Sequence, residues 1–307
     1  MGRGNPSPNP AEIDRDARRP GPPPARVECA RLNTGASLDC TLNTDTSPYR
    51  AIILSAGRGG RLLPLTERLP KCLLDVGGRS LLVWQLRALA EAGVREAVVV
   101  TGYGSEYVDL EIERHTPPGM RVRALYNPFF QVADNLASCW IARAELTGPC
   151  LILNGDTLIQ TEIARRLLAA APAPITVTID RKAAYDEDDM KVVATGDRLN
   201  AIGKKLTSGD VNGESIGFLR FDAAGSAQFV AEVERSMHVP AGLRRWYLSA
   251  INDLAGAGVD VRVVSIEGLE WGEIDYPADL ARCRTIASGW RAREPADAAA
   301  PVANTAV

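Results

Sequence analysis

The chain has 307 residues, 46% of them hydrophobic, and a formal net charge of −3 at pH 7. This length accommodates one large α/β domain or two small ones, and the hydrophobic content is ample for a core. No apolar run reaches the 18 or more residues of a membrane span, so no membrane insertion is expected. The slightly negative charge argues against a nucleic-acid-binding surface.

Cysteine and histidine usage exclude two further classes of site. The six cysteines show no CxxC spacing, which is typical of reduced thiols in a cytoplasmic protein and not of a disulfide framework or zinc site. Only two histidines, His115 and His238, are present, so histidine-based triads and metal clusters are not expected.

Both ends of the chain differ in composition from its middle. Residues 1–47 hold seven prolines within the first 24 and lack the apolar segment of a secretory signal. Such a composition cannot bury enough apolar surface to order itself, so we expect a disordered extension there and a second one in the Ala/Pro-rich tail 289–307. Residues 48–288 are expected to form a single domain.

From about residue 48, short apolar runs alternate with segments of helical periodicity. The first half predicts strands at 51–54, 97–101, 122–126, 150–153 and 175–179, and helices at 81–92, 105–115, 135–145 and 162–171. The second half predicts strands at 190–194, 201–202, 215–221 and 261–266, and helices at 223–236, 243–255 and 277–286. Strand–helix alternation with short loops indicates a mostly parallel sheet covered on both faces.

The most informative stretch is the first apolar run, which ends in a glycine loop at 55–60. Glycines let backbone N–H groups approach an anion and adopt φ > 0, so this loop is a candidate triphosphate cradle. Arg58, Arg61 and Lys71 are its candidate counter-charges. A Walker A loop would need Lys-Ser/Thr after the last glycine, and the Rossmann pattern needs a glycine where Leu62 stands. A plain strand-to-helix turn remains the alternative.

Two aspartates stand where a metal could bind. Asp156 follows the apolar run 150–153, and the carboxyl ends of strands in open α/β sheets face the ligand crevice. Asp275 lies in Glu273-Ile-Asp275, shortly before the helix that Pro277 would open. Each aspartate has an alternative role as the cap of the helix that follows it.

The segment Leu-Ser-Ala-Gly-Arg-Gly-Gly-Arg-Leu-x-Pro-Leu-Thr, with Pro-Lys-Cys-Leu-Leu-Asp-Val-Gly-Gly-Arg-Ser-Leu-Leu shortly after it, resembles the opening of the sugar-nucleotidyltransferase superfamily. The usual family form has Ala-Ala-Gly where Ser55-Ala-Gly57 stands. The resemblance implies a three-layer, Rossmann-like fold of the GT-A type with a mixed, mostly parallel central sheet. It also implies the condensation of a nucleoside triphosphate with a phosphorylated acceptor and the release of pyrophosphate.

The resemblance also implies roles for individual residues. Asp156 and Asp275 match the two aspartates that hold the catalytic Mg²⁺, an ion that favours carboxylate and phosphate oxygens. The acceptor oxygen is already anionic, so no general base is needed. Lys71 and Arg61 are then the expected catalytic residues, through positioning and charge stabilisation; a surface salt bridge is the alternative for Lys71. The expected nucleotide-binding residues are Leu54, Ser55, Ala56, Gly57, Arg58, Gly59, Gly60, Asn135 and Ser138, the last two having a helix-cap alternative.

The resemblance extends to about residue 285, and it is closest to bacterial cytidylyltransferases for phosphocholine, 2-aminoethylphosphonate and inositol 1-phosphate. It implies CTP as the nucleotide and a small phosphorylated or phosphonate acceptor. Choline-specific relatives place a Trp where Met190 stands. That loss counts against phosphocholine, although other aromatic residues could supply the faces that a quaternary ammonium needs. We rank phosphocholine-like or aminophosphonate head groups first, inositol 1-phosphate next and hexose 1-phosphate last. The expected acceptor-binding residues are Lys191, Glu214, Tyr247 and Glu273; a solvated strand lysine is the alternative for Lys191.

Two hypotheses from other classes are weaker. A catalytically silent nucleotide-binding regulatory homologue would be expected to lose a basic or acidic site residue, and all of them are present. A dinucleotide-dependent oxidoreductase would need the third glycine and an acidic residue after the second strand, where Thr101-Gly-Tyr103 stands. The resemblance leaves room for a homodimer without requiring one.

Overall fold

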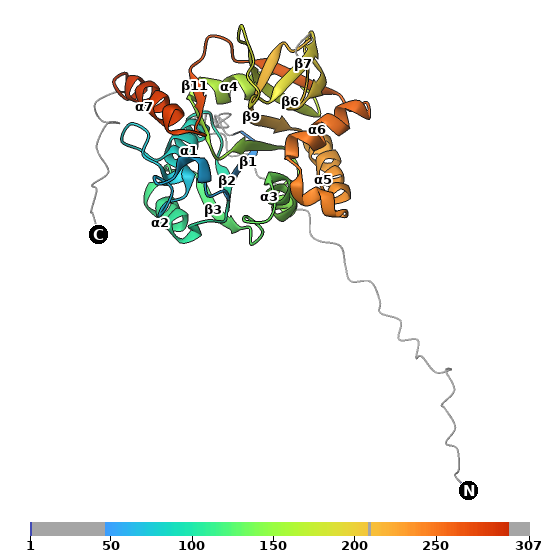
Figure 1. Cartoon of the computed structure of the whole chain (residues 1–307), viewed down its shortest axis with the longest axis horizontal. Helices are drawn as coiled ribbons and strands as arrows, with labels where there is room; N and C mark the ends of the chain where they lie inside the picture. The colour runs from blue at the N-terminus through green and yellow to red at the C-terminus, as the bar shows by residue number, and fades with distance from the viewer. Residues whose placement is uncertain (2–46, 208–209, 295–307) are drawn as a thin grey trace, which may run out of the picture. The chain divides into compact units, whose positions relative to one another are not determined.

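The computed structural model describes Met1, residues 47–207 and residues 210–294 (Figure 1). The proline-rich extension apart from Met1 and Ser47, and the tail from residue 295, lie outside the described residues, so their expected disorder stays a prediction. Among the described residues, no helix is long and apolar enough to cross a membrane.

A nine-stranded mixed sheet forms the centre of the domain, in the order β3-β2-β1-β4-β9-β6-β10-β8-β7 (Figure 1). Its strands are β1 (Arg50–Leu54), β2 (Glu96–Thr101), β3 (Arg121–Tyr126), β4 (Cys150–Asn154), β6 (Ile175–Asp180), β7 (Lys191–Thr195), β8 (Arg198–Ile202), β9 (Gly213–Phe221) and β10 (Val261–Ser265). The strands β3, β2, β1 and β4 are parallel neighbours, whereas β9 and β8 run against the adjacent strands. The predicted mixed, mostly parallel sheet is confirmed.

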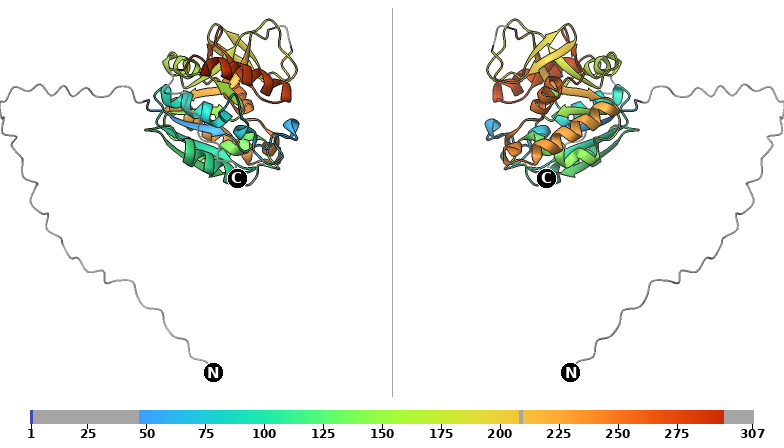
Figure 2. Two further views of the ribbon diagram at one scale, coloured as in Figure 1. Left: turned by 90° about the vertical axis from the view of Figure 1, so that its left-hand side faces the viewer. Right: turned by 90° about the vertical axis from the view of Figure 1, so that its right-hand side faces the viewer.

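Helices cover both faces of this sheet, because successive strand residues point to opposite sides. Ile52 packs in one core cluster with α3 (Asn135–Ile141), α5 (Ala223–Met237) and α6 (Tyr247–Gly256). Ile53 packs in the other. The helices of that second face are α1 (Leu81–Glu91), α2 (Ser105–His115) and α4 (Thr161–Ala169). The side views in Figure 2 show α5 and α6, in orange, on the flank opposite to α7 (Pro277–Arg291), in red.

The structure differs from the sequence-based elements at a few places. The expected helix 243–255 begins only at Tyr247, because Pro240–Arg244 forms a 3-10 turn. The last helix runs to Arg291, past its expected end at 286 and past the expected domain boundary at 289. It continues because Trp290 is buried edge-on against Trp84, with ring centroids 5.6 Å apart.

Two short strands were not predicted from the sequence. They are β5 (Thr157–Ile159) and β11 (Trp271–Glu273), which pair antiparallel in a small second sheet. Three residues are too few to show an alternating pattern. This small sheet brings the segment after β4 next to the segment before α7.

The strand order reverses at β1, since β2 and β3 lie on one side of it and β4 on the other. The register pairs Leu54 with Asn154, so both strands end at the same edge. In open α/β sheets, ligands bind in the crevice at such a switch point.

Candidate active site

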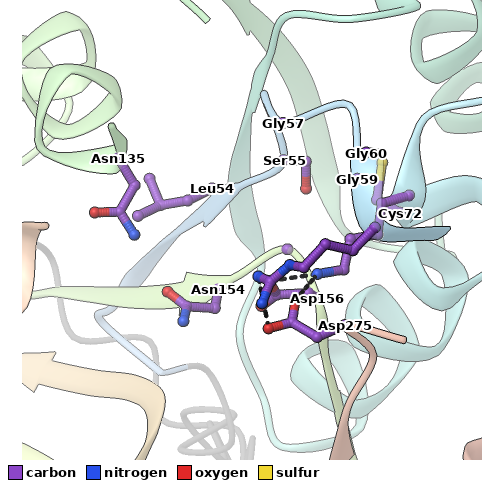
Figure 3. Close-up of a pocket in the computed structure, with 13 residues that line it drawn as sticks. Leu54, Ser55, Gly57, Gly59, Gly60, Cys72, Asn135, Asn154, Asp156 and Asp275 are labelled. Atoms are coloured by element: carbon purple, nitrogen blue, oxygen red, sulfur yellow. Dashed lines mark hydrogen bonds and ion pairs between the residues drawn. The ribbon is translucent and has the colours of Figure 1, made fainter. Parts of the chain in front are cut away.

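A cavity of about 470 Å³ opens where β1 and β4 end (Figure 3). Ten of the residues predicted from the sequence line it: Leu54, Ser55, Gly57, Gly59, Gly60, Arg61, Lys71, Asn135, Asp156 and Asp275. Cys72, Asn154 and Gly155 line it as well and were not among the predicted site residues. The cavity therefore joins the glycine loop to both aspartates.

The glycine loop wraps around the stem of Lys71. Gly59 has φ +76°, a left-handed conformation that favours glycine, and a Cβ there would lie 3.0 Å from Lys71 Cβ. Thr66 Oγ1 donates to Gly59 O at 2.8 Å and holds the loop in place. At Gly57 and Gly60, a Cβ would meet nothing within 4 Å, so there is open space beside the loop.

Lys71 bridges the two aspartates. Its Nζ lies 2.9 Å from Asp156 Oδ2 and 2.6 Å from Asp275 Oδ1, and 13% of its side chain is exposed. Burial opposes its charge, but the two carboxylates outweigh burial and raise the pKa of Lys71, so it is protonated at neutral pH. A buried cation held in this way can stabilise an anionic ligand that enters the cavity.

Arg61 pairs with the second carboxylate oxygen of Asp275, the one that Lys71 does not contact. Its Nη2 lies 2.8 Å from Asp275 Oδ2, and its guanidinium stacks on Tyr276 with Cζ 5.1 Å from the ring centroid. Burial alone would raise the pKa of Asp275, but Lys71 and Arg61 lower it below its usual value. Asp275 is therefore a carboxylate at neutral pH.

Three acidic side chains meet beside the cavity, and two of them, Asp156 and Asp275, line it. Asp156, Glu273 and Asp275 each offer one oxygen, and these oxygens lie within 4.8 Å of one another. Asp156 Oδ1 is buried and has no hydrogen-bond partner within the part of the chain that the structure describes. Burial and the neighbouring charges of Asp156 and Asp275 raise the pKa of Glu273 to about 8. A cluster of carboxyl oxygens, of which Asp156 Oδ1 has no hydrogen bond among the described residues, fits a hard divalent cation such as Mg²⁺.

A buried glutamine, Gln85 of α1, holds the turn between β4 and β5 in place. Its Nε2 donates to Asn154 O at 2.7 Å and to Thr157 O at 2.8 Å, which fixes the turn that carries Asp156. The backbone of Ile274 donates to Asp156 O at 3.0 Å and ties the β11 segment to the same turn. Sequence reasoning missed Gln85; its signal is a polar residue within the apolar run of α1.

Three predicted nucleotide-binding residues lie outside the cavity lining. Ala56 is buried, and its carbonyl accepts from the backbone of Tyr103 at 3.1 Å. Arg58 is exposed and stacks on the Tyr103 ring at 5.1 Å. Ser138 is buried, and its Oγ accepts from Asn127 Nδ2 at 3.1 Å, so it supports the loop before α3.

The predicted acceptor-binding residues separate into different environments. Lys191 is buried, and its Nζ donates to Asp186 O at 2.5 Å and Lys204 O at 3.2 Å. Glu214 is buried beside Lys182, with Oε2 2.7 Å from Nζ. Both side chains are therefore engaged by the protein itself.

Tyr247 requires a correction, because it is fully buried and no part of it can touch an acceptor in this conformation. Its hydroxyl has no hydrogen-bond partner, and burial raises its pKa well above the usual value, with smaller contributions from the charges of Asp156 and Glu273. Its backbone N–H donates to Asn135 Oδ1 at 2.9 Å. Tyr247 thus underlies the site and orients Asn135.

Lys204 is close enough for its charge to act on Asp275, and it was not among the predicted residues. Its Nζ lies 4.9 Å from the ring centroid of Trp246, and its charge contributes to the lowered pKa of Asp275. Among the described residues it has no carboxylate partner within 4 Å. The sequence offered lysines at 191, 204 and 205, and only the fold separates the buried one from the one whose charge acts on Asp275.

Comparisons with known proteins agree with this geometry. The CMP-5'-(3-aminopropyl)phosphonate synthase of Streptomyces rubellomurinus is 32% identical over 246 residues, which are 76% of this chain and 38% of that protein. The CTP:phosphoglutamine cytidylyltransferase of Campylobacter jejuni is 25% identical over 75% of this chain and 97% of its own length. The chain thus spans well under half of the Streptomyces relative and nearly all of the Campylobacter one.

A solved structure supports the fold independently. The inositol-1-phosphate CTP transferase from T. maritima superposes with a TM-score of 0.67 and 19% sequence identity, over 78% of this chain and 95% of that one. The family model described as Nucleotidyl transferase matches residues 50–203, the half of the chain that carries the glycine loop, Lys71 and Asp156. The chain therefore belongs to the nucleotidyl transferase family.

Proposed function

We propose that this protein is a Mg²⁺-dependent cytidylyltransferase that transfers CMP from CTP to a small phosphorylated or phosphonate acceptor. The observation that carries the proposal is the position of Lys71 between Asp156 and Asp275 in the cavity beside the glycine loop. This arrangement places alternating cations and carboxylates around one space, as a triphosphate with a bound metal requires.

Asp156 and Asp275 would hold Mg²⁺, with Glu273 beside them, and the ion would neutralise charge at the α-phosphate of the nucleotide. Arg61 and Lys71 then stabilise the anionic phosphates, while the loop beside Gly57 and Gly60 leaves room for them. The acceptor's anionic oxygen forms the new bond to the α-phosphorus, and the bond to the β-phosphate oxygen breaks to release pyrophosphate. No proton has to be removed from the attacking oxygen.

The cytidine assignment rests on the relatives, whose names include CMP or CTP. Asn135 provides a suitable polar group at the nucleotide end of the cavity. Its Oδ1 is engaged by the backbone of Tyr247, so its NH₂ remains as a donor toward a base or ribose oxygen. The reaction draws on CTP, and we propose that it takes place in the cytoplasm.

The acceptor side combines one available cation with one available carboxylate. Lys204 suits the acceptor's phosphate or phosphonate group, because its charge acts on Asp275 and it has no carboxylate partner within 4 Å among the described residues. Glu273 has no basic side chain within 4 Å among the described residues. Its pKa of about 8 leaves it mainly protonated in the ligand-free protein, and a bound ammonium group would favour its ionised form. An aminoalkylphosphonate or phosphocholine-type acceptor is therefore preferred over inositol 1-phosphate or a sugar 1-phosphate.

A pyrophosphate-release assay tests this proposal. The purified protein is mixed with Mg²⁺, each of the four nucleoside triphosphates and a panel of 2-aminoethylphosphonate, phosphocholine, inositol 1-phosphate and glucose 1-phosphate. Release with CTP and a phosphonate or phosphocholine acceptor, abolished in Asp156→Asn, supports it. No release with any pair, or release unchanged in Asp156→Asn, contradicts it.

A further inference from the structure

An ammonium group already lies between two acidic side chains just beyond the end of β6. Lys182 Nζ lies 2.8 Å from Asp189 Oδ2 and 2.7 Å from Glu214 Oε2. The carboxylate side chains are 11% and 7% exposed, whereas that of Lys182 is 35% exposed. The Tyr185 ring lies on another side of the ammonium, with its centroid 5.9 Å from Nζ. Two nearly buried carboxylates and an aromatic face are the components of a cation-binding site.

Structural links connect this cluster to the candidate active site. Asp180, at the end of β6, accepts a hydrogen bond from Trp271 Nε1 at 2.8 Å, and Trp271 begins the strand that carries Glu273. Asp180 also pairs with Glu214 across β6 and β9. The charge of Glu214 contributes to the raised pKa of Glu273, so the two acidic side chains interact electrostatically. The segment 182–189 therefore lies near the strand that carries Glu273, and none of its residues is among those that line the cavity.

The position of Lys182 has a consequence for the charge that an acceptor meets. Asp189 and Glu214 are largely removed from water. The pKa of Asp189 is lowered, so this carboxylate would attract another cation if Lys182 were absent, whereas the pKa of Glu214 is raised to about 7 and its carboxyl would become more fully protonated. With Lys182 in place, their charge is offset. Buried ion pairs contribute little to stability on balance, which makes a role in specificity a reasonable function for this one.

We propose that Lys182 is a specificity-determining residue, which fills with its own ammonium a cation site that would otherwise bind a cationic head group of the acceptor. The proposal rests on the cytidylyltransferase function above. It leaves Glu273 as the carboxylate that a small ammonium meets, and it limits the attraction for larger or additional cationic groups. Lys182 acts through charge next to the acceptor and takes no part in the bond changes.

Two measurements on Lys182→Ala, Lys182→Arg and Arg262→Ala test the proposal. Arg262 of β10 is a matched control, since it also pairs with two carboxylates, Asp260 at 2.6 Å and Asp197 at 2.7 Å. The first measurement is the ratio of kcat/KM for 2-aminoethylphosphonate to kcat/KM for inositol 1-phosphate. Losing one cation near the head group should raise this ratio on the order of tenfold in Lys182→Ala. The ratio should not change in Lys182→Arg or Arg262→Ala.

The second measurement does not depend on turnover. Ethylammonium chloride should raise the Tm of Lys182→Ala more than sodium chloride at equal ionic strength, because ethylammonium fits the vacated carboxylate pair. The wild type and Arg262→Ala should show no such difference. An unchanged acceptor ratio with both kcat/KM values lowered equally, or equal Tm shifts with the two salts, would overturn the proposal. If the wild type turns over no acceptor, the cytidylyltransferase function fails, and the Tm arm still decides whether the cation site exists.

Discussion

Lys71 and Asp275 are 204 residues apart in the chain, and their side-chain atoms Nζ and Oδ1 meet at 2.6 Å. The contact depends on the small β5–β11 sheet, which brings the segment before α7 to the end of β4. The same ammonium reaches Asp156 at 2.9 Å. One side chain thus joins the glycine loop to both proposed metal ligands.

Replacing Lys71 by Met should separate its stabilisation of the anionic phosphates from its competition with a metal ion for Asp156 and Asp275. Without the ammonium, transfer should fall about 10²- to 10³-fold, as for the loss of one charge-stabilising donor. The nucleotide-free protein should bind Mn²⁺ more tightly, because Nζ no longer competes for the two carboxylates. Titration of free Mn²⁺ by electron paramagnetic resonance checks this, with Arg262→Met as the control. Equal or weaker Mn²⁺ binding in Lys71→Met would show that Lys71 does not compete with the cation.

Gly59→Ala should weaken both stability and CTP binding. A left-handed conformation costs a non-glycine residue about 1–2 kcal/mol, and the new Cβ would lie 3.0 Å from Lys71 Cβ. Gly119→Ala is the matched control, because it has φ +74° with nothing within 4 Å. Urea unfolding should report a similar loss for both variants, whereas KM for CTP should rise in Gly59→Ala alone. A normal KM in Gly59→Ala would argue against the cradle role of the loop.

Gln85→Leu should reduce activity without removing any group that touches a ligand. The substitution leaves the carbonyls of Asn154 and Thr157 without their buried partner, which costs about 1–3 kcal/mol. The turn that carries Asp156 then loses its fixed position. Unfolding free energy and kcat should both fall, while Gln160→Leu, at the half-buried N-cap of α4 where the side chain makes no capping hydrogen bond, should change neither by much. Normal kcat in a folded Gln85→Leu protein would contradict this support role.

The pH dependence of stability should contain a contribution from Glu214. Burial and the charge of Asp189 outweigh Lys182 and raise the pKa of Glu214 to about 7, from 4.5 in the unfolded chain. The folded state therefore binds more protons between these values, so the contribution of Glu214 to stability is full below pH 4.5 and is lost as pH rises to about 7. Urea unfolding at pH 5 and pH 7.5 should show a smaller decline in Glu214→Gln than in the wild type. Identical declines would place the pKa of Glu214 near its usual value.

The sequence was informative where the signal is local. The glycine loop and the spacing to Lys71 follow from contiguous residues, and the long strands follow from apolar runs that end in small or polar residues. The aspartates at 156 and 275 could be proposed as partners only through family resemblance, since nothing local reveals a contact across β5 and β11.

The sequence did not reveal which of the polar side chains are buried. Tyr247 and Lys191 are polar enough to suit an acceptor site, but α6 packs Tyr247 into the core and Lys191 donates to two backbone carbonyls. Lys204 looks equivalent to Lys191 in the chain, yet it is the one whose charge acts on Asp275. Which polar side chains face a cavity depends on strand order and helix packing, and these are set by contacts across the whole domain.

The most direct test of the account is ³¹P nuclear magnetic resonance of a mixture of CTP, Mg²⁺, 2-aminoethylphosphonate and the protein. The account predicts that resonances of a new phosphate–phosphonate anhydride and of pyrophosphate grow together with the wild type. Asp275→Asn, which removes one charge of the carboxylate cluster, should give neither at the same protein concentration. Pyrophosphate without the anhydride, or equal product with Asp275→Asn, would contradict cytidylyl transfer at this site.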